Sequence, residues 1–145
     1  MFILDTDHIS LFQRYDAAVS ARVLSTPAVE LATTVITVEE QLRGRLAQVR
    51  RARSDAEVVR TYRSLLATIV YFQTITVIAF DESAQAMFNR LRAQNPRVGT
   101  QDLRIAAIAL SQEATLVTRN RQDFAGVLSL QIEDWSSTEA EGSGH

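Results

Sequence analysis

The sequence predicts a single α/β domain in which a parallel β-sheet is covered by helices on both faces. Its length of 145 residues is that of one domain with a real core. Hydrophobic residues make up 46% of the chain and charged residues 22%, which is close to the average for globular proteins and predicts order for most of it. Short apolar runs alternate with longer segments of helical periodicity, as in βαβ units.

The first strand is expected at residues 2–4, which are three consecutive apolar residues. Helical segments are expected near 8–13 and 16–25, where leucine and valine supply the apolar positions. The run ELATTVI at 30–36 predicts the second strand, because it is apolar and rich in β-branched residues.

Two helices are expected after the second strand. The first begins at about residue 38, where apolar residues recur with helical spacing at Val38, Leu42, Leu46 and Val49. The second covers roughly 55–72. The run TITVIAF at 74–80 predicts the third strand.

The rest of the chain repeats the alternation. A helix is expected from Asp81 to just before Asn95-Pro96, because proline disfavours helix in the residue preceding it. A further helix at about 101–113 leads to a fourth strand at 115–118, and 129–135 predicts a last short strand. We therefore expect one domain over residues 1–135, followed by a disordered polar tail over 136–145.

Composition excludes several kinds of site. The chain has no cysteine, which excludes disulfides, thiolate zinc sites and cysteine nucleophiles. Met1 leads directly into the first strand without a basic segment and a long apolar stretch, and no apolar run approaches the ~20 residues of a membrane span. We therefore expect a cytoplasmic protein that does not associate with a membrane.

The net charge of −2 carries no nucleic-acid signature, but the distribution of charge is uneven. All 15 basic residues are arginine, and a group of them lies close together in sequence: Arg43, Arg45, Arg50, Arg51 and Arg53, with Arg60 and Arg63 soon after. The planar guanidinium matches phosphate oxygens, so this group could hold a nucleic-acid backbone. It could equally form a solvated helical face or pair with acids on a partner protein.

Acids and an amide follow the carboxyl ends of four predicted strands. They are Asp5 and Asp7, Glu39 and Glu40, Asp81, and the pair Asn120 and Asp123. In open parallel sheets ligands gather beyond these strand ends, so the residues are candidates for a functional site. The acids of the first strand could cap a helix, bind a metal or act as a nucleophile.

Several of these acids also have a purely structural interpretation. Thr37 to Glu40 fits a capping box, and Asp81 is most simply a helix N-cap. Asp102 lies in the first turn of a predicted helix, where a carboxylate interacts favourably with the helix dipole. It also shares one helical face with Ile105, Ala106 and Ala109, so it should point toward the core or a cleft. A buried carboxylate needs a cation, and the chain has no lysine, so a divalent metal would suit Asp102.

Four segments together resemble the successive motifs of PIN domains, specifically the VapC-type toxins of toxin–antitoxin systems. They are FILDTDHIS near the start, ITVEEQLRG in the middle, and GTQDLRIAAIAL and TLVTRNRQDF toward the end. The resemblance extends from Phe2 to Trp135. It implies a metal-dependent endoribonuclease of the PIN fold, a cognate antitoxin as partner and a homodimer.

Carried over motif by motif, the resemblance implies that Asp5, Glu40 and Asp102 form the catalytic metal site. Asn120 stands where the fourth ligand, often aspartate, is expected, and Asp123 lies one turn further on. The implied ion is Mg²⁺ or Mn²⁺, which oxygen ligands suit. It would lower the pKa of a bound water for attack on RNA.

Further residues are expected to support this site. Thr6 and Thr118 are candidate hydrogen-bond donors to the metal ligands, with Asp7 and Asp123 nearby. Contacts to RNA or to the antitoxin are expected from four arginines, Arg43, Arg50, Arg51 and Arg53. His8 is expected to pack or hydrogen-bond locally.

Two alternatives stay open. The opening Asp-x-Asp also resembles haloacid-dehalogenase-type phosphatases, in which Asp5 would be the phosphorylated nucleophile and Asp7 the acid. That family places a lysine near the phosphoryl group, and this chain has none. The other alternative is a catalytically inactive PIN-like binding module whose acids only cap helices.

Overall fold

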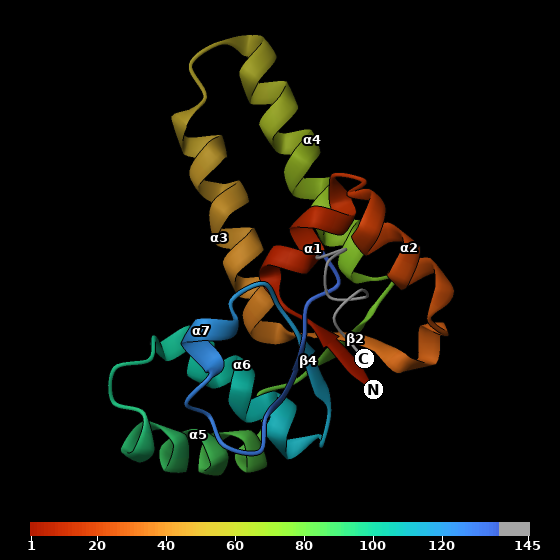
Figure 1. Ribbon diagram of the computed structural model, residues 1–145. Coiled ribbons are helices and arrows are strands. Elements are labelled where there is room, and N and C mark those ends of the chain that lie inside the picture. The colour runs from red at the N-terminus through yellow and green to blue at the C-terminus, as the bar shows by residue number, and fades with distance from the viewer. Residues whose placement is uncertain (137–145) are drawn as a thin grey trace.

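The computed structural model describes residues 1–136 of the chain. A five-stranded parallel sheet with the order β3-β2-β1-β4-β5 lies at its centre, and helices cover both faces (Figure 1). The predicted α/β architecture is confirmed. Of the tail expected over 136–145, all but Ser136 lies outside the described residues.

The strands are β1 (Phe2–Leu4), β2 (Leu31–Thr34), β3 (Thr76–Ile78), β4 (Thr115–Val117) and β5 (Gln131–Glu133). The helices are α1 (Thr6–Gln13), α2 (Ala17–Ser25), α3 (Val35–Arg51), α4 (Asp55–Phe72), α5 (Glu82–Gln94), α6 (Thr100–Ser111) and α7 (Arg121–Phe124), with a 3₁₀ turn at Ala28–Glu30. No helix in residues 1–136 is long and apolar enough to cross a membrane.

The sheet separates two clusters of buried side chains. Ile3 of β1 points to one face, where it packs with Leu116 and with residues of α5 and α6. Leu4 points to the other face, where it packs with Val117, Ile9 and other residues of α1, α2 and the end of α4. Successive residues of the central strand are therefore both buried, which explains its uninterrupted apolar sequence.

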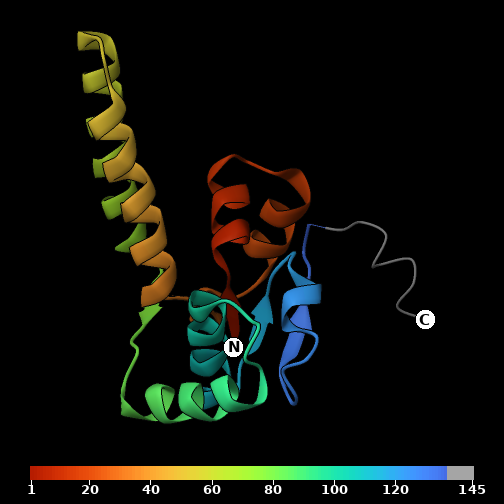
Figure 2. The same ribbon diagram turned by 90° about the vertical axis from the view of Figure 1, so that its left-hand side faces the viewer.

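Helices α3 and α4 form a hairpin whose tip projects away from the sheet (Figure 2). Only the lower part of the hairpin reaches the core, where Ile36 is 6% exposed and Phe72 is 9% exposed. Near the tip, the chain turns between α3 and α4 at residues 52–54, and Ser54 caps α4 by accepting a hydrogen bond from the amide of Glu57. The hairpin is therefore an arm that carries most of the sequence-clustered arginines outside the core.

The start of α3 differs from the prediction. Strand β2 ends at Thr34, and the helix begins at Val35 rather than at about residue 38. Thr34 is the N-cap and accepts from the amide of Thr37 at 3.1 Å, so the proposed capping box from Thr37 to Glu40 is wrong. β-Branched residues continue past Thr34 into the first turn of the helix, and strand propensity could not locate this boundary.

Gly44 lies in the middle of α3, and a Cβ built on it would meet no atom within 4 Å. We expect Gly44→Ala to raise the free energy of unfolding by roughly 0.5–1 kcal/mol, because alanine loses less backbone entropy in a helix. Urea denaturation monitored by circular dichroism measures this change. A destabilised variant would mean that the outer face of α3 is covered in the native protein.

Candidate active site

The candidate site begins where β1 and β4 end side by side. The direction of the chain across the sheet reverses here, because β1 is followed by β2 and β3 on one side, whereas β4 and β5 are added on the other side of β1. Asp5 follows β1 and is 7% exposed. Its carboxylate accepts hydrogen bonds from the Thr6 amide at 2.7 Å and from the Thr118 hydroxyl at 2.8 Å. Thr118 thus contacts Asp5, and its supporting role at a metal site stays a prediction.

Helix α3 brings Glu40 to the same place. The Thr6 hydroxyl lies 3.1 Å from Glu40 Oε1, so Thr6 touches two of the predicted acids through its amide and its hydroxyl. Glu39, which helical phase alone could not separate from Glu40, turns elsewhere. It forms an ion pair with Arg43 at 2.9 Å and accepts from Gln101 at 2.9 Å.

Asp102 enters from the first turn of α6. Gly99 is the N-cap of this helix, and a Cβ placed there would lie 3.6 Å from Asp102 Oδ2. Ile105 and Ala106, which follow Asp102 by one helical turn on the same face, are buried. This face of α6 therefore directs Asp102 inward, as its sequence pattern predicted. Burial, followed by the charges of Asp123 and Asp7, raises the pKa of Asp102.

These residues form an acidic cluster of five members, Asp5, Asp7, Glu40, Asp102 and Asp123. Burial raises the pKa of Asp5 to about 6, and the charges of Asp7 and Asp102 add to the effect. Burial also raises the pKa of Glu40, with a contribution from Asp102. Burial and the neighbouring negative charges therefore disfavour the ionised form of each of the three predicted catalytic acids. A cation bound between them would reduce the repulsion between their charges.

Asp7 is held by several donors at the edge of the cluster. Its Oδ2 accepts from the Arg119 amide at 3.1 Å and lies 3.3 Å from the Thr118 hydroxyl oxygen, whose one hydrogen has its shorter contact with Asp5. Its Oδ1 lies 2.7 Å from Nδ1 of His8, a residue with no exposed surface. The other ring nitrogen accepts from the Trp135 amide at 3.1 Å, which leaves Nδ1 to donate to Asp7.

His8 thus makes local hydrogen bonds, as expected, but it also orients Asp7. The sequence pattern did not predict this second role. Its only signal is the adjacency of Asp7 and His8 at a strand exit, because Trp135 lies 127 residues away along the chain.

Asn120 and Asp123, the two candidates for the fourth ligand, are joined to each other. The Asn120 side-chain amide donates to Asp123 Oδ2 at 2.7 Å, while its backbone amide donates to the Thr118 hydroxyl at 3.0 Å. Asp81 accepts from the Ala84 amide at 2.9 Å and caps α5, which confirms its predicted structural role.

The oxygen-rich composition of the cluster suits a hard divalent cation. Within residues 1–136, however, no three acidic or histidine side chains are close enough together to enclose an ion by themselves. Mg²⁺ sites commonly use one or two carboxylates and complete their coordination with water and substrate phosphate, so the donor set fits such a site. The assignment of Asp5, Glu40, Asp102 and Asn120 as ligands stays a prediction.

The hydroxyl of Thr118 can be tested independently of any activity. It donates to Asp5 and thereby lowers the pKa of that carboxyl against the effect of burial. We expect Thr118→Val to raise the Asp5 pKa by about one pH unit, because one such hydrogen bond is worth ~1.4 kcal/mol. NMR titration of the Asp5 carboxyl measures it. Thr118→Ser keeps the hydroxyl and should titrate like the wild type; equal pKa values in both variants would contradict the assignment.

No protein-family model matches the chain. A segment of 48 residues, 33% of this chain, is 42% identical to ribonuclease VapC1 of Haemophilus influenzae strain R2866 and spans 36% of that relative. The match thus covers about a third of the curated protein's length.

Solved structures match over a much greater length. DNA-bound VapBC from Salmonella typhimurium has a TM-score of 0.76 at 25% identity, over 92% of this chain and 97% of that one. VapBC-1 from nontypeable Haemophilus influenzae has a TM-score of 0.73 at 25% identity, over 94% of this chain and 98% of that one.

The parallel sheet, with acids gathered at the carboxyl end of its strands, is the fold that these solved VapBC toxin–antitoxin structures support for this chain. In fold, and over the 48 residues matched to ribonuclease VapC1, the chain is similar to PIN domains of the VapC type. The resemblance proposed from the four motifs is therefore confirmed.

Proposed function

We propose that this protein is a metal-dependent endoribonuclease and the toxin component of a toxin–antitoxin pair. The observation that carries the proposal is the acidic cluster at the carboxyl end of the sheet. Burial raises the pKa of Asp5, Glu40 and Asp102 there, and the charge of Asp102 adds to the shifts of Asp5 and Glu40. Ribonuclease VapC1, to which part of the chain is similar, bears the same activity in its name.

Asp5, Glu40 and Asp102 would hold a divalent ion, Mg²⁺ or Mn²⁺, with Asn120 as a candidate fourth ligand. When bound, the ion would supply an activated water for attack on phosphorus and would neutralise charge on the phosphate oxygens. Thr6 and Thr118 keep the carboxylates oriented through the hydrogen bonds described above. Asp7, fixed by His8, adds negative charge beside them.

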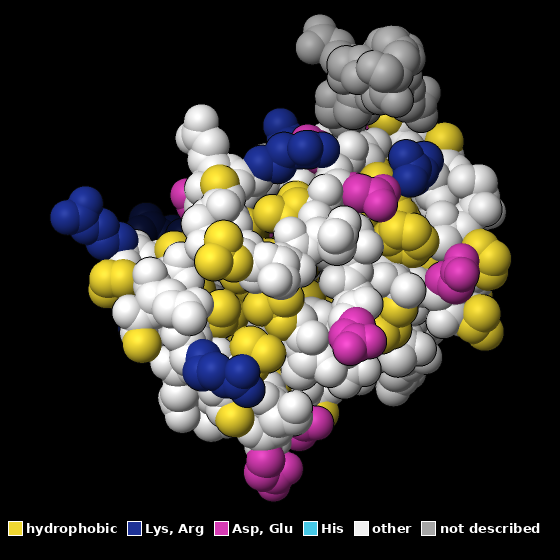
Figure 3. Space-filling view, turned by 60° about the horizontal axis from the view of Figure 1, so that its bottom comes forward, with side chains coloured by type: hydrophobic (Ala, Val, Ile, Leu, Met, Phe, Trp, Pro, Cys, Tyr) yellow, Lys and Arg dark blue, Asp and Glu magenta, His cyan; other side chains and the backbone are white. Residues whose placement is uncertain are grey.

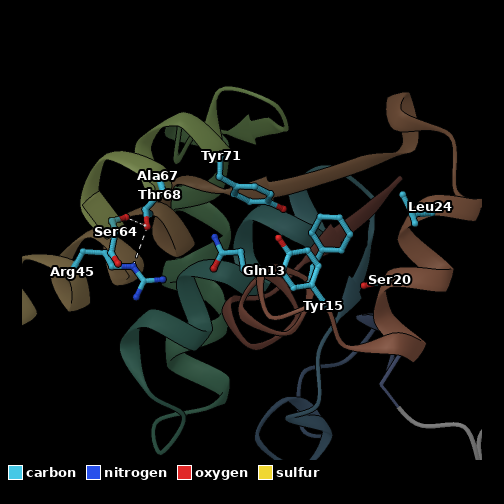
Figure 4. Close-up of a pocket in the computed structure, with 10 residues that line it drawn as sticks. Gln13, Tyr15, Ser20, Leu24, Arg45, Ser64, Ala67, Thr68 and Tyr71 are labelled. Carbon is cyan, nitrogen blue, oxygen red and sulfur yellow. Dashed lines mark hydrogen bonds between the residues drawn. The ribbon is translucent and has the colours of Figure 1, made fainter. Parts of the chain in front are cut away.

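The partner proposed for this protein is a cognate antitoxin, because the similar solved structures contain VapBC complexes. A suitable surface exists at a hollow of about 680 Å³ between α1, α2 and α4, away from the acidic cluster (Figure 4). Tyr15 and Leu24, which line it, are 88% and 79% exposed, and Tyr71 forms part of its wall. Exposed apolar side chains around a hollow are typical of protein-binding surfaces.

We further propose that the protein acts on RNA in the cytoplasm and forms a homodimer, as VapC-type proteins are expected to do. The four arginines predicted to contact RNA or antitoxin, Arg43, Arg50, Arg51 and Arg53, all lie on or beside the arm. The phosphatase alternative gains no support, because Asp7, its proposed acid, is committed to His8, Thr118 and Arg119.

The test is cleavage of total cellular RNA by purified protein free of antitoxin. Defined fragments should appear with Mg²⁺ or Mn²⁺ and disappear when EDTA is added. Sequencing of the new RNA ends would identify the substrate, even one that makes up a small part of the pool. Cleavage that persists in EDTA would contradict the metal-dependent mechanism.

A further inference from the structure

The arm contains a second hollow, which is polar and carries positive charge. It has a volume of about 400 Å³ and lies between α3 and α4. Three arginines line it, Arg45, Arg51 and Arg60, together with Gln48, Thr61 and Ser64. Arginines 45 and 60 were not among the residues assigned to RNA or antitoxin contact, because helical spacing alone does not show which side chains of two helices meet.

The hollow has an excess of positive charge, because three arginines and only one acid, Glu57, line it. Among residues 1–136, the arginine ion pairs are those of Arg22 with Glu133 and Arg43 with Glu39. Glu57 also lines the hollow, but its carboxylate accepts from the Arg53 amide at 2.8 Å and serves the start of α4. Arg45 is oriented by Thr68, whose hydroxyl accepts from its Nε at 3.0 Å.

A path along α3 leads from this hollow toward Glu40. A smaller hollow of about 160 Å³, lined by Ser10, Gln41 and Gly44, shares Arg45 and Gln48 with the larger one. Gln41 follows Glu40 in the chain, and Gln41 donates to the Ser10 hydroxyl at 3.0 Å. Gly44 leaves the surface between the two ends open.

The length of this path suits a nucleic-acid strand. Glu40, Gly44, Gln48 and Arg51 recur at helical spacing along one side of α3. Eleven residues of helix separate Glu40 from Arg51, which corresponds to about 16 Å at ~1.5 Å per residue. A stacked strand advances ~3.4 Å per nucleotide, so the hollow would meet a phosphate about five nucleotides from the acidic cluster.

We propose that the hollow lined by Arg45, Arg51 and Arg60 is a phosphate subsite that holds the RNA strand on one side of the cleavage point. The inference rests on the proposed ribonuclease function. An acidic segment of a protein partner is disfavoured, because the polar hollow leads toward Glu40 of the acidic cluster whereas the neighbouring apolar hollow offers a protein surface. On the α5 side of the molecule, by contrast, acidic and basic side chains are scattered among hydrophobic ones (Figure 3).

RNA binding measured in EDTA, where the proposed cleavage does not occur, tests the phosphate subsite separately from catalysis. The probe is a fluorescein-labelled single-stranded RNA 12-mer of random sequence, and its anisotropy is measured against the full-length protein in EDTA over a range of salt concentrations. We expect Arg51→Gln/Arg60→Gln to bind about tenfold more weakly at low salt. The slope of log affinity against log salt should become shallower by about 1.4, or ~0.7 for each lost contact to a single strand.

The matched control is Arg90→Gln, which removes the same charge from an exposed position on α5. It should bind RNA within about twofold of the wild type. The single variant Arg60→Gln should change the slope by about half as much as the double variant does. A double variant that binds like Arg90→Gln would overturn the subsite. So would a polyglutamate peptide that binds more tightly than RNA with the same dependence on Arg51 and Arg60. Cleavage by the wild type in Mg²⁺ would leave the ribonuclease function standing in either case.

Discussion

Asp5→Asn, Glu40→Gln and Asp102→Asn are each expected to lower RNA cleavage by at least about a thousandfold. Each substitution keeps the shape of the side chain and removes one negative charge from the acidic cluster. A carboxylate that holds a catalytic ion contributes several kcal/mol to the transition state, and ~1.4 kcal/mol corresponds to a factor of ten in rate. Initial rates on the RNA identified by end sequencing measure the loss.

Asp81→Asn is the control for these variants. Asp81 is also an acid that follows a strand of the sheet, but its carboxylate caps α5. The variant should cleave RNA within about twofold of the wild type and lose at most ~1 kcal/mol of stability. In cells, the wild-type chain should arrest growth without its antitoxin, and Asp5→Asn should not. An equally toxic Asp5→Asn variant would count heavily against the assignment.

The metal-free protein is expected to lose stability as the pH rises from about 4 to 6. The pKa of Asp5 is about 6 in the folded protein against an ordinary value of 3.8, so the folded state binds this proton more tightly than the unfolded state does. Stability is therefore greatest below the unfolded pKa and falls until the pH passes the folded pKa. The difference between 3.8 and about 6 corresponds to about 3 kcal/mol. Glu40 and Asp102 act in the same direction.

Urea denaturation in EDTA from pH 4 to pH 7 measures this effect, and Asp5→Asn isolates the part due to Asp5. The variant should show about 3 kcal/mol less loss across the range. At pH 7, millimolar Mg²⁺ or Mn²⁺ should stabilise the wild type by binding its native state, and should stabilise Asp5→Asn less. If the wild type and the variant have parallel pH profiles, the charge of Asp5 is not strained in the native fold.

The sequence was most informative about the acidic residues, because an acid that follows a buried strand or faces a core has few structural roles. The strand exits made Asp5 one of several site candidates together with Asp7, and the inward face of α6 added Asp102. The family motif was needed to select Asp5 as a metal ligand. Glu40 could not be separated from Glu39 by periodicity, and only the family motif favoured it. The structure gives the physical reason, since Thr6 reaches across from α1 to Glu40 while Arg43 and Gln101 hold Glu39.

Boundaries and long-range pairings were not predictable in the same way. β-Branched residues continue from β2 into α3, so their strand propensity hid the start of the helix at Val35. The short helix α7 was also missed, because four residues carry no measurable periodicity. The hydrogen bonds of His8 to Asp7 and Trp135 join the two ends of the domain, and no local pattern records such a contact.

The order in which the chain is synthesised has a consequence for when the acidic cluster is complete. The central strand β1 leaves the ribosome before the other strands, and the Thr118 hydroxyl on Asp5 follows Asp5 by 113 residues. At ~5–20 residues per second, the acidic cluster stays incomplete for roughly 6–24 seconds of translation. Trp135, which covers Phe2 and fixes His8, arrives later still. On the proposed function, a nascent chain therefore has no assembled nuclease site beside the ribosome that makes it, and the interval would give an antitoxin translated at the same time the opportunity to meet the chain as it folds.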